Sequence, residues 1–162
     1  GCEGGSMDSA FKYVIDYGIC LYKDYPFVAT DGECNTKNCS KKISIDTYHD
    51  VISNSESQLE KAVTEQPISV AIQANLRSFQ LYKRGVYSDP DCSGMLDHGV
   101  LLVGYGYDNE YELDYWIIKN SWGPEWGENG YMRLEKNTPD QRGMCGIAMD
   151  PSYPVIYGTS EH

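Results

Sequence analysis

The hydrophobic pattern of the chain changes its period near residue 45, and this change constrains the fold more than any other feature. After Ser6, apolar residues recur every three to four positions until Gly18, which predicts an amphipathic helix. The next segment, residues 20 to 39, is rich in turn residues and contains three cysteines. We expect disulfide bonds to hold this loop, because it has little apolar periodicity of its own.

Beyond residue 45, most of the pattern is typical of β-strands. A capping box from Ser55 to Gln58 predicts one helix that ends before Pro67, and a short helical stretch is expected from Phe79 to Lys83. Strands are expected in ISVAIQA (68–74), GVLLVGYG (99–106), DYWIIKNSW (114–122) and GYMRLE (130–135). A helix and the cysteine-rich loop thus come first, and antiparallel strand signals follow, which indicates an α+β fold.

The charge and the apolar content argue against two classes of partner. The net charge is −11, and the basic residues are scattered except in KNCSKK, whereas nucleic-acid phosphates need clustered Lys and Arg. No stretch approaches the ~20 apolar residues of a membrane span. Six cysteines in an acidic chain suggest a lysosome, a vacuole or the outside of the cell. The first residues resemble no leader peptide, so we expect a mature or cut chain.

One histidine stands at the start of an apolar run, in MLDHGVLLVGYG. Most single histidines are structural, and His98 becomes a catalytic candidate only if it has partners elsewhere in the chain. The segment IIKNSWGPEWGENGYMRL offers Asn120 at the end of a buried strand, with Trp122 close by, although tryptophan beside glycine is often simple packing over a turn. We expect the Asn120 amide oxygen to accept the N–H of one ring nitrogen of His98.

A neutral orienting residue favours a cysteine nucleophile. A thiolate already neutralises the imidazolium, whereas a serine nucleophile usually needs a carboxylate behind its histidine. Asp97 is poorly placed to orient the neighbouring ring, because consecutive strand residues point to opposite faces. Metal and cofactor sites are not expected: the histidines at 49, 98 and 162 lack ligand spacing, there is no C-x-x-C, and GYGYDN lacks the last glycine of a dinucleotide-binding loop.

Four ordered motifs give the chain a resemblance to the papain family of cysteine proteases, in its cathepsin L-like group. These motifs are GCEGGSMDSAF, LDHGVLLVGYG, YWIIKNSWGPEWGENGYMRL and MCGIAMDPSYPV, and the similarity extends to about residue 157. The resemblance implies a papain-like two-lobe fold. Residues 1–45 would be the C-terminal part of a helical lobe, residues 46–150 an antiparallel, β-barrel-like lobe, and residues 151–162 a strand and tail returning to the first lobe.

The resemblance also implies a role for each matching residue. His98 would be the general base and acid, Asn120 its orienting residue, and Trp122 a shield that keeps water from their hydrogen bond. Gly4 and Gly5 would let an extended substrate backbone approach, and the carbonyl of Asp97 would accept a substrate amide. The pocket for the side chain two positions before the cut would be lined by Ser6, Met7, Ala71 and Leu96, with Asp150 at its floor.

The nucleophile that the family carries is not among these residues. It lies in C-G-[SA]-C-[WY], about 130 to 150 residues before the histidine, whereas His98 has 97 residues before it and no cysteine here precedes Trp or Tyr. We therefore expect a larger C-terminal piece of a protease, inactive without its N-terminal segment. By the resemblance Cys92 pairs with Cys145, Cys2 and Cys34 pair with cysteines of that segment, and Cys20 and Cys39 form an added bridge.

The sequence thus predicts a cysteine-type endopeptidase that acts on peptides and proteins. Its other expected partners are its own N-terminal segment and a propeptide or cystatin-like inhibitor; no cofactor is expected. Two alternatives remain open. One is an inactive papain-like homologue that binds peptides or serves for storage. The other is a disulfide-rich binding module, for which six cysteines in 162 residues are sparse.

Overall fold

The computed structural model describes residues 3 to 158, so the predictions for Cys2 and His162 lie outside the described part. The chain divides into two compact units. Unit 1 comprises residues 1–49 and 154–162, and unit 2 comprises residues 50–153. These boundaries lie a few residues after the breaks expected at 45/46 and 150/151.

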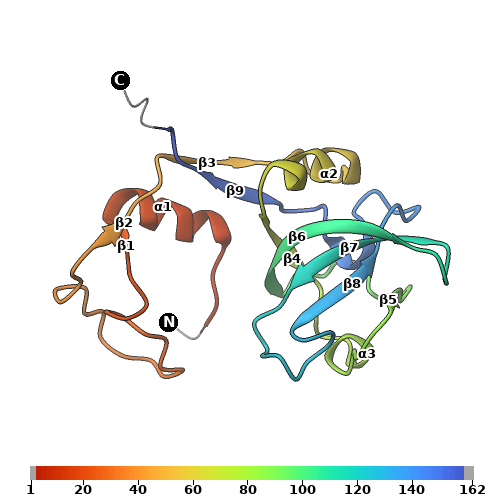
Figure 1. Cartoon of the computed structure of the whole chain (residues 1–162), viewed down its shortest axis with the longest axis horizontal. Helices are drawn as coiled ribbons and strands as arrows, with labels where there is room; N and C mark the ends of the chain where they lie inside the picture. Colours follow the sequence, from red (N-terminus) through yellow and green to blue (C-terminus); the bar gives the residue numbers. More distant parts are fainter. Residues whose placement is uncertain (1–2, 159–162) are drawn as a thin grey trace. The chain divides into compact units, whose positions relative to one another are not determined.

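In the described residues of unit 1, a helix is followed by a long loop that a two-stranded sheet closes (Figure 1). Helix α1 (Met7–Tyr17) begins where the Ser6 side chain accepts a hydrogen bond from the N–H of Ser9. It ends at Gly18, which has a φ of +68° and donates its N–H to the carbonyl of Val14. Strand β1 (Ile19–Cys20) pairs antiparallel with β2 (Lys42–Ile43). The helix predicted from the apolar period is thus present.

Unit 2 contains most of a seven-stranded sheet together with two helices and a short 3-10 helix. The sheet order is β3-β9-β4-β6-β7-β8-β5, and the chain passes between the units within β3 and β9. The elements are β3 (Thr47–Asp50), α2 (Glu56–Glu65), β4 (Ile68–Ile72), α3 (Arg77–Gln80), β5 (Val86–Tyr87), β6 (His98–Asp108), β7 (Leu113–Lys119), β8 (Tyr131–Glu135), η1 (Met144–Gly146) and β9 (Ser152–Val155).

The strand pairs agree with a largely antiparallel α+β fold. Strand β4 pairs antiparallel with β6, β6 with β7, and β7 with β8. The short strand β5 is an exception, because it pairs parallel with β8. The prediction that the strand 114–122 runs through Trp122 is wrong: β7 ends at Lys119, where the Asn120 side chain accepts the N–H of Ser121 and turns the chain. The short helix begins at Arg77 rather than Phe79.

The buried apolar side chains of the described residues all belong to unit 2. Leu59 and Val63 project from α2 into this core, and Trp116 of β7 is fully buried. The indole N–H of Trp116 donates to Glu56 at 2.8 Å, which ties the first turn of α2 to the sheet. Burial raises the pKa of the Glu56 carboxyl above its ordinary value, although the Trp116 hydrogen bond opposes this shift.

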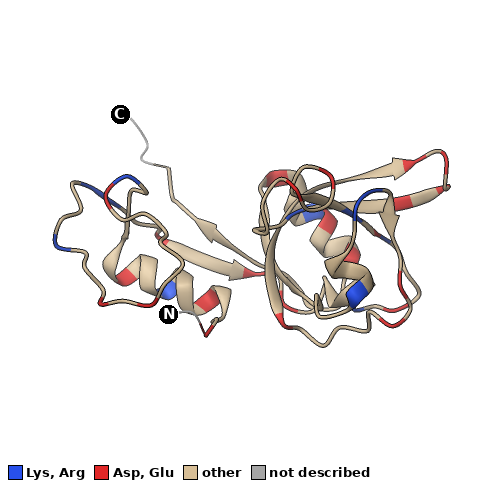
Figure 2. Cartoon of the chain, turned by 90° about the horizontal axis from the view of Figure 1, so that it is seen from below, with Lys and Arg blue, Asp and Glu red and all other residues tan. Residues whose placement is uncertain are grey.

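Charged residues occur in both units, and acidic ones mark the β6–β7 hairpin tip, as Figure 2 shows. Asp108 at the end of β6 binds the guanidinium of Arg133, which also contacts Glu128 at 2.9 Å. These contacts tie the turn end of the hairpin to Arg133 of β8. Within residues 3 to 158 no helix is long and apolar enough to cross a membrane.

Candidate active site

The imidazole of His98 and the amide of Asn120 form the centre of the candidate site. His98 is the first residue of β6 and lies opposite Ile72 of β4, and Asn120 directly follows β7. The Nε2 of His98 and the Oδ1 of Asn120 are 2.8 Å apart. Adjacent antiparallel strands therefore bring together two residues that are 22 positions apart in the sequence.

The local backbone determines which atom of the Asn120 amide faces the ring. Its Oδ1 also accepts the N–H of Ser121 at 2.7 Å, so the oxygen is held on the side of these two donors. Since an amide oxygen can only accept, Nε2 of His98 carries the proton. The other ring nitrogen, Nδ1, is then the one that can gain and lose a proton in a reaction.

Asn120 is itself held rigidly. It is only 7% exposed, and its backbone N–H donates to the carbonyl of Gly130 at 2.9 Å. The Nδ2 group is buried and has no hydrogen-bond partner among the described residues. A water-excluded amide strengthens the hydrogen bond to the ring, because the local dielectric constant is low.

The indole of Trp122 lies beside the imidazole. The two ring centroids are 5.0 Å apart with planes inclined by 32°, and Trp122 remains 40% exposed. Beneath it lie Phe79 and Trp126, both in edge-to-face contact at 5.8 and 5.3 Å. The Trp126 indole N–H donates to the carbonyl of Gln80 at 3.1 Å. The sequence predicted that the indoles of Trp122 and Trp126 cover the amide of Asn120, but it did not predict the contact of Phe79, which signalled only a short helix.

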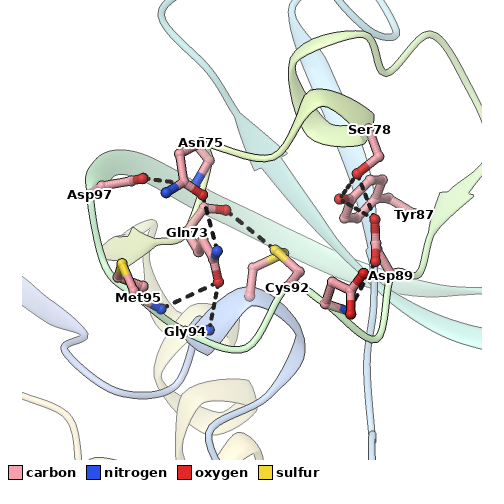
Figure 3. Close-up of a disulfide and its surroundings, with 12 residues drawn as sticks. Gln73, Asn75, Ser78, Tyr87, Asp89, Cys92, Gly94, Met95 and Asp97 are labelled. Atoms are coloured by element: carbon pink, nitrogen blue, oxygen red, sulfur yellow. Dashed lines mark hydrogen bonds between the residues drawn. A yellow bond between two sulfur atoms is a disulfide. The ribbon is translucent and has the colours of Figure 1, made fainter.

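The residues before His98 are anchored to the end of β4. The N–H of Asp97 donates to the carbonyl of Ile72 at 3.0 Å, and its carboxylate accepts the N–H of Ala74 at 2.7 Å. Between these two residues Gln73 is buried, and its side chain binds the loop before His98 (Figure 3). The sequence pattern predicted a strand through Gln73 and gave no sign of this contact.

The remaining predicted binding residues are divided between the units. Unit 1 contains Gly4, Gly5, Ser6 and Met7, which lead into α1; a Cβ at either glycine would meet no atom within 4 Å. Unit 2 contains half-buried Ala71 and Leu96 and exposed Asp97 and Asp150. The structure brings His98, Asn120 and Trp122 together, and the roles in substrate binding remain predictions.

The described residues form two disulfides, Cys20–Cys39 in unit 1 and Cys92–Cys145 in unit 2. Cys34 has a free, exposed thiol, and its expected pairing with another segment stays a prediction, as does that of Cys2. Within the described part of the chain, no group of three or more His, Cys, Asp or Glu side chains is placed to hold a metal ion.

Comparison with known proteins gives long and consistent matches. The model of the papain family cysteine proteases matches residues 1–155. The chain is 50% identical to cysteine proteinase RD21A of Arabidopsis thaliana over 160 residues and 52% identical to the oryzain beta chain of Oryza sativa subsp. japonica over 162. These alignments cover 98% and 99% of this chain but 34% of each relative, so the chain spans about a third of their length.

Solved structures give the same result. The bromelain protease of Ananas comosus in complex with the E64 inhibitor has a TM-score of 0.91 and 42% identity, covering 97% of this chain and 72% of that one. The proform of the ragweed pollen allergen Amb a 11, a cysteine protease, has a TM-score of 0.91 and 39% identity, with coverages of 97% and 47%.

Proposed function

This chain belongs to the papain family of cysteine proteases, and from that premise we propose that the protein carrying it is a cysteine-type endopeptidase. The observation that carries the proposal is the hydrogen bond of 2.8 Å between His98 and Asn120, with the carboxamide oxygen facing the ring. The nucleophile would be a cysteine in a segment N-terminal to these 162 residues. Without that segment the chain would have no peptidase activity.

The reaction follows from the proton positions at His98. With Nε2 held protonated by Asn120, Nδ1 takes the proton of the cysteine thiol, and the resulting imidazolium stabilises the thiolate. The thiolate sulfur attacks the carbonyl carbon of the peptide bond and forms a tetrahedral intermediate. As the carbon–nitrogen bond breaks, Nδ1–H protonates the leaving amine. Neutral His98 then takes a proton from water, whose oxygen displaces the cysteine sulfur and releases the carboxylic acid.

Trp122 contributes by covering the polar pair. Its ring lies 5.0 Å from the imidazole and is supported by Phe79 and Trp126, so it can exclude water while the imidazole changes charge. A neutral orienting residue such as Asn120 suits this site, because a carboxylate there would compete with the thiolate for the imidazolium.

We further propose that an extended peptide pairs with Gly4, Gly5 and the Asp97 carbonyl, as the family resemblance implies. Both glycines leave room for a backbone to approach, since an added Cβ would lie in open space. The pocket for the residue two positions before the cut would take its wall from Ser6, Met7, Ala71 and Leu96.

We propose that the carboxylate of Asp150 widens the range of substrate side chains that this pocket accepts. It is exposed in unit 2, directly before Pro151. A carboxylate at the floor would admit Arg or Lys beside apolar side chains. Comparing cleavage of peptides with Leu or Arg at this position, with and without Asp150→Ala, tests the role; an unchanged Arg/Leu ratio would refute it.

A propeptide and a cystatin-like protein are proposed as inhibitory partners. Among the structural relatives, the ragweed protease is a proform and bromelain is bound to E64. Both findings support the proposal of a propeptide or an inhibitor as a partner. We also propose a lysosome-like vacuole or the outside of the cell as the location, where the two disulfides would persist.

Covalent labelling with E64 tests the proposed activity. The full-length protein at acidic pH should form a one-to-one adduct and lose its activity against a peptide with leucine two positions before the cut. His98→Ala should abolish peptide cleavage, whereas His49→Ala, the matched control at an exposed position in β3, should not change it. No adduct in the wild-type protein would contradict the proposal and favour an inactive homologue that binds peptides or serves for storage.

A further inference from the structure

The buried side chain of Gln73 binds the loop that leads to His98. Gln73 directly follows β4 and is 6% exposed. Its Oε1 accepts two backbone N–H groups, that of Gly94 at 3.0 Å and that of Met95 at 3.3 Å. Its Nε2 donates to the Asn75 side chain at 3.0 Å. Figure 3 shows the Gln73 carboxamide with its oxygen directed at the N–H groups of this loop and its nitrogen directed at Asn75.

The backbone of the same stretch is fixed by other contacts. The N–H of Gln73 donates to the carbonyl of Cys145 at 2.9 Å, and the N–H of Cys145 donates to the carbonyl of Cys92 at 3.0 Å. The Cys92–Cys145 disulfide joins these two segments covalently. Gln73 therefore extends from a rigid base, and its side chain can hold a loop in a defined place.

The loop has few other ways to hold residues 94 and 95. Gly94 has a φ of +89° and packs so closely on Gly146 that a Cβ on Gly146 would lie 2.8 Å from its Cα. Neither amide belongs to a strand, because β6 begins at His98. An amide oxygen with two lone pairs satisfies both N–H groups at once, and an apolar side chain would remove this acceptor from both.

The other anchors of this region act two and three residues beyond Met95. Asp97 is bound through its own N–H and its carboxylate, and His98 is held by the pairing with Ile72 and by Asn120. Gln73 thus fixes the part of the loop before Leu96, while the position of the imidazole depends on separate contacts.

We propose that Gln73 is a positioning residue for substrate binding: by holding Gly94 and Met95, it presents Leu96 and the Asp97 carbonyl to an extended peptide. This inference rests on the proposed peptidase function. It predicts that a substitution of Gln73 weakens the binding of a peptide and leaves the reactivity of the nucleophile unchanged.

Two substitutions in the full-length protein separate the acceptor from the volume of the side chain. Gln73→Met keeps a similar volume and removes the acceptor, and Gln73→Glu keeps an acceptor for both N–H groups. With a peptide that has leucine two positions before the cut, Gln73→Met should raise KM about tenfold, since two hydrogen bonds to the loop are lost. Gln73→Glu should stay within about threefold of the wild type, and Gln141→Met, at an exposed glutamine, should change nothing.

Two further measurements distinguish positioning from a loss of folding. The pH profile for alkylation of the nucleophile by iodoacetamide, which is too small to use the loop, should be the same in Gln73→Met as in the wild type. Hydrogen exchange of the Gly94 and Met95 amides should become faster in Gln73→Met and stay slow in Gln73→Glu.

Each result has a defined meaning. An unchanged KM in Gln73→Met, or amides that stay protected in it, would overturn the proposal. An equal loss in Gln73→Glu, or a parallel loss of alkylation, would overturn it in favour of a general structural role. A wild-type protein that neither cleaves peptides nor reacts with iodoacetamide would instead contradict the proposed function, and the amide exchange would still report whether Gln73 holds the loop.

Discussion

Units 1 and 2 are held together by different kinds of interaction. Unit 2 has an apolar core that includes fully buried Trp116 and Leu59. In the described part of unit 1 no apolar side chain is buried, and α1 presents all of its residues at least partly to solvent. Local links stabilise unit 1 instead, namely the Ser6 cap, the Cys20–Cys39 disulfide and the stacking of Phe11 on Tyr48.

This difference determines which unit can hold side chains in fixed positions. His98 and Asn120 lie at the ends of strands whose inner side chains form the core of unit 2, so both are held by a packed scaffold. The glycines proposed to contact a substrate backbone belong to unit 1, where their surroundings are open. The proposed proton transfer thus lies in the unit with an apolar core, whereas the proposed substrate-binding residues are divided between the two units.

The largest expected effect comes from the core of unit 2. In the 162-residue chain, Leu59→Ala should lower the free energy of unfolding by about 2–5 kcal/mol, because it leaves a cavity. Ile52→Ala, at a side chain 66% exposed, should change it by less than about 0.5 kcal/mol. Urea unfolding followed by tryptophan fluorescence measures both, since all three tryptophans lie in unit 2. Equal losses of unfolding free energy in the two variants would mean that the apolar core does not determine the stability of unit 2.

Removing one disulfide at a time shows how far each unit depends on its own disulfide for stability. Replacing Cys92 and Cys145 with alanine should lower the stability of unit 2 by about 2–4 kcal/mol in the same assay. Replacing Cys20 and Cys39 should leave the tryptophan transition in place and make the 21–41 loop more sensitive to limited proteolysis. A shift of the tryptophan transition in the second variant would show that the two units unfold together.

Burial of Glu56 predicts a pH effect in unit 2. Because folding raises the pKa of this carboxyl, its contribution to stability is fully present below the pKa of the unfolded chain, about 4.3, and is lost as the pH rises through the folded value. Glu56→Gln can still accept the Trp116 hydrogen bond and cannot ionise. Its unfolding free energy should therefore fall less than that of the wild type as the pH rises from 4 to 7. Parallel pH profiles would contradict this sign.

Asp24 in unit 1 predicts the opposite change of stability with pH, a loss as the pH falls. Hydrogen bonds from the hydroxyl and N–H of Ser40 lower the pKa of the Asp24 carboxyl. Its contribution is present above the unfolded pKa, about 3.9, and is lost as the pH falls through the lowered value. Proteolysis of the 21–41 loop by an acid-active protease should therefore increase at the lowest pH in the wild type. Ser40→Ala should already be sensitive at pH 5, and equal sensitivity of the two proteins at that pH would refute the role.

The sequence was sufficient to predict those features that a local pattern or an ordered motif determines. The helix after Ser6, the helix after the capping box, four principal strands and the pairing of His98 with Asn120 belong to this group. Hydrophobic period and capping residues act over a few positions, and the family motifs identified the distant partners.

Other features could not be predicted because they depend on tertiary contacts. Gln73 looks like any polar residue at the end of a strand, and only the approach of Gly94 and Met95 gives it two donors to bind. The Ser121 N–H that orients the Asn120 amide comes from a turn, where the pattern had predicted a continued strand. The parallel pairing of β5 with β8 involves two residues on the shorter strand, too few for any periodic signal.

We propose that His98 is the charged partner of a cysteine thiolate in the full-length protein. The direct test is the rate of alkylation of the nucleophile by iodoacetamide from pH 4 to 10 in the full-length protein, with the modified peptide identified by mass spectrometry. In the wild type the reaction should be half-maximal well below pH 8.5, the ordinary pKa of a thiol, and in His98→Ala the midpoint should move up to about that value. The same midpoint in both proteins would mean that His98 does not stabilise the thiolate.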